Sequence, residues 1–366
     1  MGLVFAMYLL LLSVFLPAFI GCGNELSLGI SFRPEPTTPP DSSVQMNFYF
    51  GNLHSHTAYS DGAGSPQEAV RWARDSAGYD FYAITDHAEL LTPAEWDSTG
   101  QVIDAHTVDG EFVAIRGFEW THNTFGHINV LGTSCYVGSD DIDDLGTFYD
   151  WIDRTDGLAQ FNHPGREPSV YCDLAFQADV HDNFYGIETG NKNLANISGI
   201  YLPFFTSALK KGWRVAPTNN QDNHTLSTNS HRSVIIAAAL TRDDLLDALR
   251  ERRLYSSDDP NLELTFKSGD YWMGSNIVGD GGLYTFYVSV ADDEPIDKIQ
   301  FLNKAGTVLD THIPPTARTA ASAYFKTKVV SDDCFYVKVY GNDTNNDEPG
   351  YEQQIVVSAP IWVFPQ

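Results

Sequence analysis

The chain has 366 residues, of which 43% are hydrophobic and 13% aromatic, and its 22 basic against 48 acidic residues give a formal net charge of −26. This composition excludes wholesale disorder and allows two domains, or one large domain with an appendage. The acidity excludes a nucleic-acid surface, because phosphate contacts need clustered lysine and arginine, and it disfavours attraction to anionic lipid. We interpret it as the acidity of a soluble, exported protein.

Residues 1–22 resemble a signal peptide of the lipoprotein type. Residues 3–20 are uncharged and mostly apolar, and Cys22 is then the lipid-modified residue. No lysine or arginine precedes the apolar run and Phe19 is bulky for its place, so an uncleaved membrane anchor is the alternative. Both alternatives predict export to the cell envelope, in the periplasm or at the cell surface, with membrane contact only through this anchor. Residues 23–46 are proline-rich and predict a polar tether.

In the following region, short β-rich runs end in clusters of polar residues. Helix signals lie between several runs: capping boxes begin at Ser65 and Thr92, Thr241 caps another helix, and the apolar run 204–209 leads to Gly212. Strands alternating with helices predict a parallel sheet or barrel, with the active site at the carboxyl ends of the strands. The expected strands are 47–53, 79–84, 112–115, 127–131, 158–161, 183–187, 213–217 and 233–240.

After residue 258 the pattern changes to alternating strands separated by turns rich in glycine and aspartate. No helix signal of similar quality intervenes. The sequence therefore predicts a small antiparallel β-sandwich domain over residues 259–366, with a structural role as a cap. The expected strands are 262–266, 284–290, 296–302, 336–340 and 354–358.

Histidines and carboxylates gather in the polar clusters. His54 and His56 stand two residues apart on an expected strand, so both imidazoles point to one face, and Asp61 follows from the next turn. Imidazole nitrogens together with carboxylates suit zinc, manganese or iron. The other histidines in such clusters are His87, His127, His163 and His224, and the other candidate carboxylates are Glu119 and Asp222.

These segments resemble the successive motifs of the PHP (polymerase and histidinol phosphatase) metallohydrolase superfamily, and in particular its carbaryl-hydrolase-like branch. The motifs are Leu53-His-Ser-His-Thr57 with Ser60-Asp61-Gly62, Ile84-Thr-Asp-His87, Gly117-Phe-Glu-Trp120, Gly126-His-Ile-Asn129, Asn162-His-Pro164 and Asp222-Asn-His224. The resemblance implies a distorted (β/α)₇ barrel, here residues 47–258, with two or three divalent metal ions. Asn52 departs from the aspartate that many members have before His-x-His.

The resemblance also implies the ligand sets. One ion takes His54, His56, Glu119 and Asp222. A second takes the bridging Glu119 with His127 and His163. A third takes Asp61, His87 and His224, and these three together with Glu119 are the expected catalytic residues. His127 is the least secure ligand, because it begins a strand instead of ending one. Asp86 is expected to orient a ligand rather than to bind metal.

The implied activity is that of a metal-dependent phosphoesterase in which a metal-bridging hydroxide attacks a small-molecule phosphate ester. A carboxylester or carbamate hydrolase with the same site is the alternative, because the chain is poor in lysine and arginine, and a non-catalytic metal-binding module is a further one. Candidates for binding a substrate anion are Arg166, Lys192, His231 and Arg232. Each could equally pair with a surface carboxylate.

Three cysteines follow Cys22, namely Cys135, Cys172 and Cys334. An odd number leaves at least one of the three without a partner among them. A bridge between Cys135 and Cys172 and a set of free thiols are both compatible with the spacing.

Overall fold

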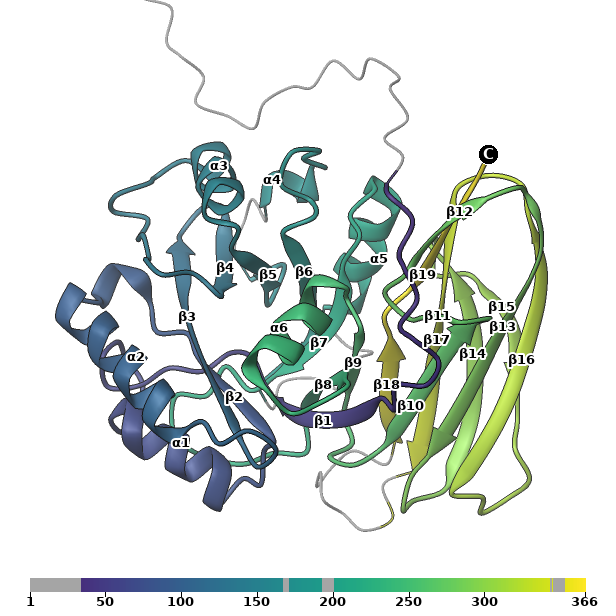
Figure 1. Ribbon diagram of the computed structural model, residues 1–366, viewed down its shortest axis with the longest axis horizontal. Helices are drawn as coiled ribbons and strands as arrows, with labels where there is room; N and C mark the ends of the chain where they lie inside the picture. The colour runs from purple at the N-terminus through teal and green to yellow at the C-terminus, as the bar shows by residue number, and fades with distance from the viewer. Residues whose placement is uncertain (1–33, 167–170, 193–200, 343, 345–352) are drawn as a thin grey trace, which may run out of the picture.

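The computed structural model describes residues 34–166, 171–192, 201–342, 344 and 353–366. In this part of the chain the fold is mixed α/β, with one large sheet, one smaller sheet and few helices (Figure 1). The predicted signal peptide and Cys22 lie outside the described residues, as does the beginning of the predicted tether. No helix within the described ranges is long and apolar enough to cross a bilayer.

Seven strands form the N-terminal half of the large sheet. Parallel pairs join β1 to β2 and β2 to β3, and likewise β5 to β6 and β6 to β7, whereas β4 runs antiparallel to both β3 and β5. The direction of β4 differs from the parallel sheet expected from sequence. The strands are β1 (Asn47–Asn52), β2 (Phe81–Ile84), β3 (Val113–His122), β4 (Gly126–Leu131), β5 (Leu158–Asn162), β6 (Phe184–Asn191) and β7 (Ala216–Asn220).

The first and last of these strands meet beyond their carboxyl ends. Ser55 and Asn223 form a parallel β-bridge, and the backbone N–H of His56 donates to the carbonyl of Asn223 at 2.9 Å. The side chain of Asn220 accepts from the backbone N–H of Leu53 at 2.9 Å. The strand ends are therefore arranged around a common centre.

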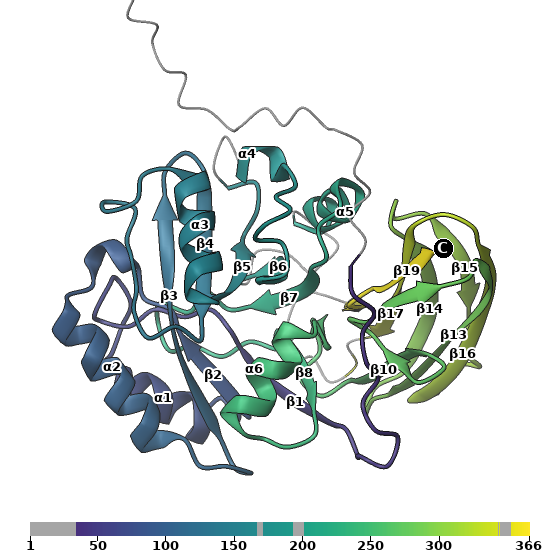
Figure 2. The same cartoon turned by 45° about the horizontal axis from the view of Figure 1, so that its top comes forward.

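The helices lie outside these strands (Figure 2). The predicted capping boxes at Ser65 and Thr92 are formed, and Gly212 ends a helix in the left-handed region at φ 107°. Three helical elements, η1, α3 and α4, were not expected, although Asp144 caps α3 by accepting from the N–H of Thr147. The helical elements are α1 (Pro66–Asp75), η1 (Ala88–Leu90), α2 (Pro93–His106), α3 (Leu145–Thr155), α4 (Tyr171–Leu174), α5 (Leu202–Lys211) and α6 (Arg242–Arg250).

The large sheet continues from β1 into the C-terminal strands. Strand β8 (Arg232–Ala237) pairs with β1, β9 (Leu254–Ser257) pairs with β8, and β9 also pairs with β18, in each case antiparallel. The predicted domain boundary near residue 258 falls between β9 and β10. The later strands of this sheet are β12 (Asn276–Gly279), β14 (Ile296–Asn303), β15 (Val308–His312), β17 (Asp333–Asn342), β18 (Gln353–Ser358) and β19 (Ile361–Pro365).

The smaller sheet packs against these C-terminal strands. Its strand order is β11-β10-β13-β16, all antiparallel. Ring contacts join the two layers, with the centroids of Phe286 and Phe335 4.6 Å apart and those of Phe301 and Phe325 5.6 Å apart. Its strands are β10 (Glu263–Ser268), β11 (Tyr271–Trp272), β13 (Gly282–Ala291) and β16 (Ala320–Val329).

Two further expectations concern the tether and the cysteines. Within residues 34–46, Thr37 exchanges hydrogen bonds with Asn276 of β12, at 2.9 Å through its N–H and 2.7 Å through its hydroxyl. The described part of the predicted tether therefore contacts the C-terminal strands. Cys135 is an exposed free thiol and Cys334 a buried one, so the considered bridge between Cys135 and Cys172 is not formed.

Candidate metal centre

The polar clusters of the sequence converge at one end of the seven strands. Each strand contributes at least one imidazole or carboxylate there, from within the strand in β3, β4 and β6 and from the residues after it in β1, β2, β5 and β7. Two of these residues, His163 at φ 28° and Asp222 at φ 45°, have positive φ, a costly conformation that clusters at functional sites. The converging side chains are those of His54, His56, Asp61, His87, Glu119, His127, His163, Glu188, Asp222 and His224.

The buried carboxylate of Glu119 is the centre of this cluster. Its Oε1 lies 3.2 Å from His54 Nε2, 3.3 Å from His127 Nδ1 and 3.4 Å from His163 Nε2. Its Oε2 lies 2.9 Å from His87 Nδ1 and 3.6 Å from His56 Nε2. One carboxylate that faces imidazoles on both of its oxygens has the arrangement of a group that bridges cations.

A second carboxylate, Asp222, closes the centre from the side of β7. Its Oδ1 lies 3.2 Å from His56 Nε2 and 3.5 Å from His54 Nε2. The two imidazole nitrogens themselves are 3.2 Å apart. His54, His163 and Asp222 also form a group whose ligand atoms lie within 4.8 Å of one another.

The third group of possible ligands is the most open to solvent. Asp61 Oδ1 lies 3.2 Å from His224 Nε2 and 3.5 Å from His87 Nε2. His56 joins them through its Nδ1, 3.9 Å from the same oxygen. The structure thus adds His56 to the set expected for a third ion.

The spacing of these atoms fits divalent metal ions. In a tetrahedral site with metal–ligand bonds of about 2.0–2.1 Å, neighbouring donor atoms lie about 3.3–3.4 Å apart. Most of the separations around Glu119, Asp222 and Asp61 fall within a few tenths of an ångström of that value. Imidazoles with carboxylates at this spacing suit zinc, manganese or iron. The clustered residues could therefore bind metal ions.

Burial and charge act against each other in the centre. Burial would raise the pKa of Glu119 and of Asp222, but the nearby histidines, His54 foremost, hold both pKa values well below their ordinary range. Burial would lower the pKa of His54, yet Asp222, Glu119 and Glu188 raise it well above the ordinary value. Without a metal, the raised pKa favours a protonated His54 among these carboxylates, and metal binding would release a proton from it.

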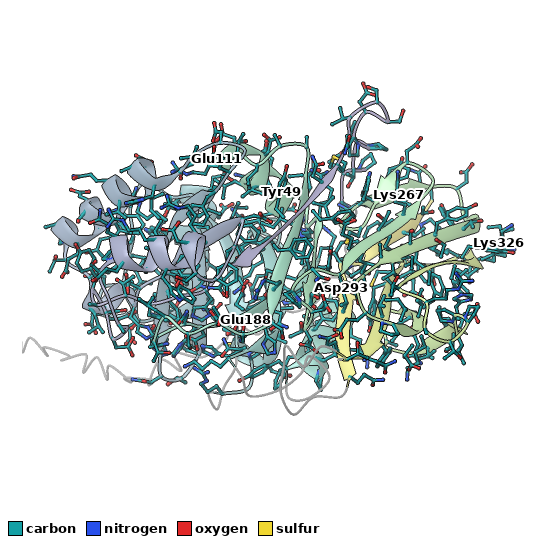
Figure 3. All side chains as sticks on the ribbon, turned by 90° about the horizontal axis from the view of Figure 1, so that it is seen from below. Tyr49, Glu111, Glu188, Lys267, Asp293 and Lys326 are labelled. Atoms are coloured by element: carbon teal, nitrogen blue, oxygen red, sulfur yellow. The ribbon has the colours of Figure 1, made fainter. Side chains whose placement is uncertain are left out.

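Glu188, within β6, orients the centre and was not among the residues expected from sequence. This fully buried carboxylate (labelled in Figure 3) accepts from His54 Nδ1 at 2.9 Å and from the backbone N–H of His163 at 2.6 Å. The first bond keeps a proton on Nδ1 and directs Nε2 of His54 to the other ligands. The signal available in the sequence was its place after an apolar β-run.

The direction of β4 explains the position of His127. Because β4 is antiparallel, its first residues lie beside the carboxyl ends of β3 and β5, with His127 paired to Thr121 and Asn162. A histidine at the start of this strand thus reaches the same centre as histidines at the ends of the others. The sequence pattern alone could not show this reversal.

Two residues hold the loops around the centre. Asp86 accepts from the N–H and hydroxyl of Thr57, at 2.6 and 2.7 Å, and from the hydroxyl of Ser60 at 2.6 Å. Asn52 donates to the carbonyl of His54 and accepts from the N–H of Gln221, both at 2.7 Å. Asp86 orients the His54–Asp61 segment, and Asn52 ties β1 to the end of β7.

The candidate anion-binding residues separate into two pairs. Lys192 Nζ lies 3.2 Å from Asp222 Oδ2 and Arg166 Nη2 lies 3.5 Å from the same oxygen, so both border the metal centre. A cavity of about 350 Å³ lies there, lined in part by Lys192, Asp222 and His224. By contrast, Arg232 stacks 4.6 Å over the ring of Tyr79, and His231 Nε2 is 3.8 Å from Asp258. These contacts give no support to substrate binding by Arg232 or His231.

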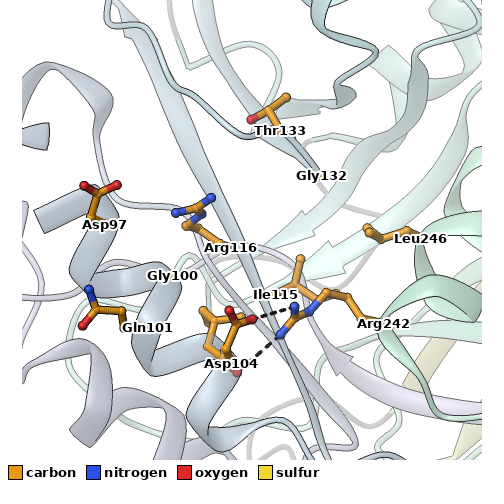
Figure 4. Close-up of a pocket in the computed structure, with 11 residues that line it drawn as sticks. Asp97, Gly100, Gln101, Asp104, Ile115, Arg116, Gly132, Thr133, Arg242 and Leu246 are labelled. Carbon is orange, nitrogen blue, oxygen red and sulfur yellow. Dashed lines mark hydrogen bonds and ion pairs between the residues drawn. The ribbon is translucent and has the colours of Figure 1, made fainter.

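Another cavity, of about 510 Å³, lies between α2, β3 and α6 (Figure 4). Its Arg242 is paired with Asp104 at 2.8 Å, and its Arg116 stacks 4.1 Å over Trp96 and donates to the carbonyl of Trp96. None of the residues that line it belongs to the described clusters with metal-binding spacing. We therefore place the candidate site at the strand ends.

No protein-family model and no curated protein matches the chain. Among solved structures, a two-domain Bacteroides vulgatus protein containing a predicted PHP-like metal-dependent phosphoesterase is 15% identical and has a TM-score of 0.47, with 90% of this chain and 99% of that chain covered. The CARDB domain of a Pyrococcus furiosus protein in complex with di-metal ions is 14% identical, with a TM-score of 0.21 and coverage of 29% and 94%. Fibronectin(III)-like modules of Clostridium thermocellum CbhA are 14% identical, with a TM-score of 0.18 and coverage of 38% and 64%. Similarity at this level assigns neither a family nor an activity to the chain.

Proposed function

We propose that the protein is an exported, metal-dependent hydrolase of the PHP superfamily, and that it acts as a phosphoesterase. The observation that carries the proposal is the carboxylate of Glu119, which lies within 3.6 Å of nitrogens from five histidines delivered by four different strands or the residues after them. The proposal includes the distorted (β/α)₇ barrel and the following β-sandwich. It is supported by the continuous series of paired strands from β1 through β7, by the bridge between Ser55 and Asn223, and by the layered C-terminal strands. Export and lipid anchoring at Cys22 rest on the first 22 residues alone.

Two or three zinc, manganese or iron ions would be held by the clustered residues. The groups that the geometry offers are His54–His56–Glu119, His54–His163–Asp222, Glu119–His127–His163 and His56–Asp61–His87–His224. When bound, such ions lower the pKa of water so that hydroxide is available near neutral pH, and they stabilise negative charge that develops on the substrate. The protein fixes the ligands through Glu188, and Asp86 orients the segment that carries Asp61.

The positive charges of Lys192 and Arg166, which border the metal centre, favour a phosphate ester over a carboxylester or carbamate as substrate. Lys192 and Arg166 approach Asp222 Oδ2, which is the oxygen turned away from His54 and His56. Both side chains are about one third exposed, so they can reach a bound anion. A phosphate group carries the negative charge that such donors bind, whereas a neutral ester or carbamate does not.

Metal analysis and parallel hydrolysis assays test the proposal. Nitrophenyl phosphate mono- and diesters would be compared with naphthyl esters and carbamates, using wild type and the double variant His54→Ala/His56→Ala. The matched control, His106→Ala/His312→Ala, removes two histidines outside the cluster. We expect only the first variant to lose both metal and phosphate-ester hydrolysis. Unchanged metal content and activity in that variant would remove the proposal, and hydrolysis of carboxylesters alone would replace phosphoesterase by the alternative activity.

A further inference from the structure

The outward face of the small sheet β11-β10-β13-β16 carries a row of aromatic rings across its strands. In the sheet register Trp272 pairs with Lys267, Lys267 with Tyr287, and Tyr287 with Tyr324, so these four residues form one continuous line. We call these four residues the aromatic row. Strands β13 and β16 lie on the side of the molecule away from the strands that carry the metal centre (Figure 1).

Two rings of the row are exposed although they are large, and the ring of Trp272 is partly buried. Tyr287 is 52% exposed and Tyr324 63%, while their neighbours Phe286 and Val288 on the opposite side of β13 are buried in the core. The period-two alternation of the strand therefore places core residues inward and these tyrosines outward. Exposed aromatic rings gathered on one face indicate a binding surface more often than solitary ones do.

The rings border a mostly apolar hollow. The centroids of Tyr287 and Tyr324 are 6.3 Å apart, with their planes at 45°. Between and beside them lies a cavity of about 320 Å³. The hydroxyls of Thr265, Ser289 and Ser322 line it, and the hydroxyl of Ser322 donates to that of Ser289 at 3.3 Å. A mostly apolar hollow with aromatic walls and a few hydroxyl-bearing residues suits a ligand that has apolar C–H faces and hydroxyls at their edges.

Lysines give this face a local charge opposite to that of the chain. The outward positions of β10 and β16 include Lys267, Lys326 and Lys328, against the carboxylate of Glu263, whereas the whole chain carries −26. Lys267 Nζ lies 4.7 Å from the ring centroid of Trp272 and Lys326 Nζ 5.6 Å from that of Tyr324, so the charges border the rings. Both lysines are labelled in Figure 3. At physiological ionic strength, charges farther away than about 8 Å are largely screened, so this local charge decides what binds.

We propose that the aromatic row and its lysines bind an acidic polysaccharide, a chain of sugar rings that carry carboxylates. The tyrosine and tryptophan rings stack against the C–H faces of successive sugars, and the hydroxyls of the hollow bond to sugar hydroxyls. The lysines bind the carboxylates. A second copy of this chain fits less well, because a two-fold contact would bring the same lysines against one another. A peptide strand would pair with a sheet edge, and this surface is a face.

Affinity electrophoresis of the full chain tests this proposal. Native gels would contain polygalacturonate, with neutral dextran as the uncharged comparison and phosphatidylglycerol–phosphatidylcholine vesicles in a separate sedimentation assay. We expect retardation by polygalacturonate that weakens with salt, and a loss of affinity of about tenfold in each of Tyr287→Ala and Tyr324→Ala. Lys326→Gln should weaken binding as well. The matched control is Lys298→Gln, because Lys298 lies 4.2 Å over Tyr340 on the other sheet and has the same kind of ring contact.

Melting temperature and hydrolase activity would show that each variant is folded. Polygalacturonate binding that is unchanged in both folded tyrosine variants would overturn the proposal. So would equal retardation by dextran, or sedimentation with vesicles in the absence of polygalacturonate binding. Equal losses in Lys326→Gln and Lys298→Gln would likewise refute the placement of the binding face.

Discussion

Replacing Glu188 by glutamine should weaken metal binding without changing the size of the side chain. Every polar neighbour of this carboxylate within hydrogen-bonding distance in the described structure is a donor. Oε1 accepts from His54 Nδ1 at 2.9 Å, Asn220 Nδ2 at 3.0 Å and Gln160 Nε2 at 3.4 Å. Oε2 accepts from the N–H of His163 at 2.6 Å and Asn191 Nδ2 at 2.8 Å. Whichever way the amide of Glu188→Gln is turned, its NH₂ group therefore faces donors.

The magnitude follows from the role of this carboxylate. Removing a group that orients a metal-ligating histidine costs about 10–100-fold in metal affinity, or about 1.4–2.7 kcal/mol. We expect this loss for Glu188→Gln, because in one amide orientation His54 Nδ1 loses its acceptor and in the other the backbone N–H of His163 does, so either way one metal-ligating histidine is less well held. The assay is competition for zinc or manganese between the protein and a chelating dye, with the melting temperature of the metal-free protein as a check of folding.

Asp258→Asn is the matched control. Asp258 is also buried, and its two oxygens accept from Asn219 Nδ2 at 3.0 Å and from the N–H of Ile355 at 3.1 Å, away from the metal centre. This variant should lose stability and keep its metal affinity. Equal metal affinity in Glu188→Gln and wild type, or an equal loss in both variants, would refute the reasoning.

Three further variants or conditions test other parts of the structure. Lys192→Ala should raise KM for a phosphate monoester about tenfold and leave carboxylester hydrolysis unchanged, because its ammonium group borders the centre. Burial, with the charge of Arg214, lowers the pKa of His181 from 6.5 to about 4, so the unfolded chain binds more protons as pH falls. The free energy of unfolding should therefore fall by up to about 3 kcal/mol between pH 6.5 and pH 4 in denaturant titrations. Gly51→Ala should cost about 3 kcal/mol, because a Cβ there would lie 2.2 Å from the carbonyl oxygen of Phe81.

Each of these predictions has its own control. Lys298→Ala removes a lysine far from the centre and should leave KM unchanged. The acid-dependent loss of stability should be smaller in His181→Asn, and an unaltered slope in that variant would contradict the assignment. Gly279→Ala introduces a Cβ that meets no atom within 4 Å, so it should change stability by less than about 0.5 kcal/mol. A similar loss in the two glycine variants would reject the steric argument.

Local signals in the sequence located most of the helices and the strands of the first half. The capping boxes at Ser65 and Thr92 specify helix starts through hydrogen bonds within four residues, so no distant contact is needed to recognise them. The same holds for His54 and His56, which share a face through strand geometry alone. That they meet Glu119 followed from the expectation that strand ends gather, and the structure brings them together.

The features that sequence did not show depend on contacts between distant segments. Glu188 lies in no recognised motif, and its role appears only when β6 places it beside His54. His127 stands at the start of its strand, and only the antiparallel direction of β4 brings it to the ends of the other strands. Arg232 was an attractive anion ligand by residue type, but the sheet register turns its guanidinium to Tyr79. Pairing direction and register set these outcomes, and neither is encoded in a short motif.

The pairing of β9 with both β8 and β18 has a consequence for handling the protein. Tyr255, Ser256 and Ser257 use their backbone groups on one side for β18, so ending the chain directly after β9 would leave that row of N–H and C=O groups open to any other chain. A shortened protein would thus be prone to aggregate while its histidine motifs remained complete. If such a truncated protein lost hydrolase activity, the exposed edge of β9 would be a sufficient cause. The loss would not be evidence that the C-terminal strands contact the substrate.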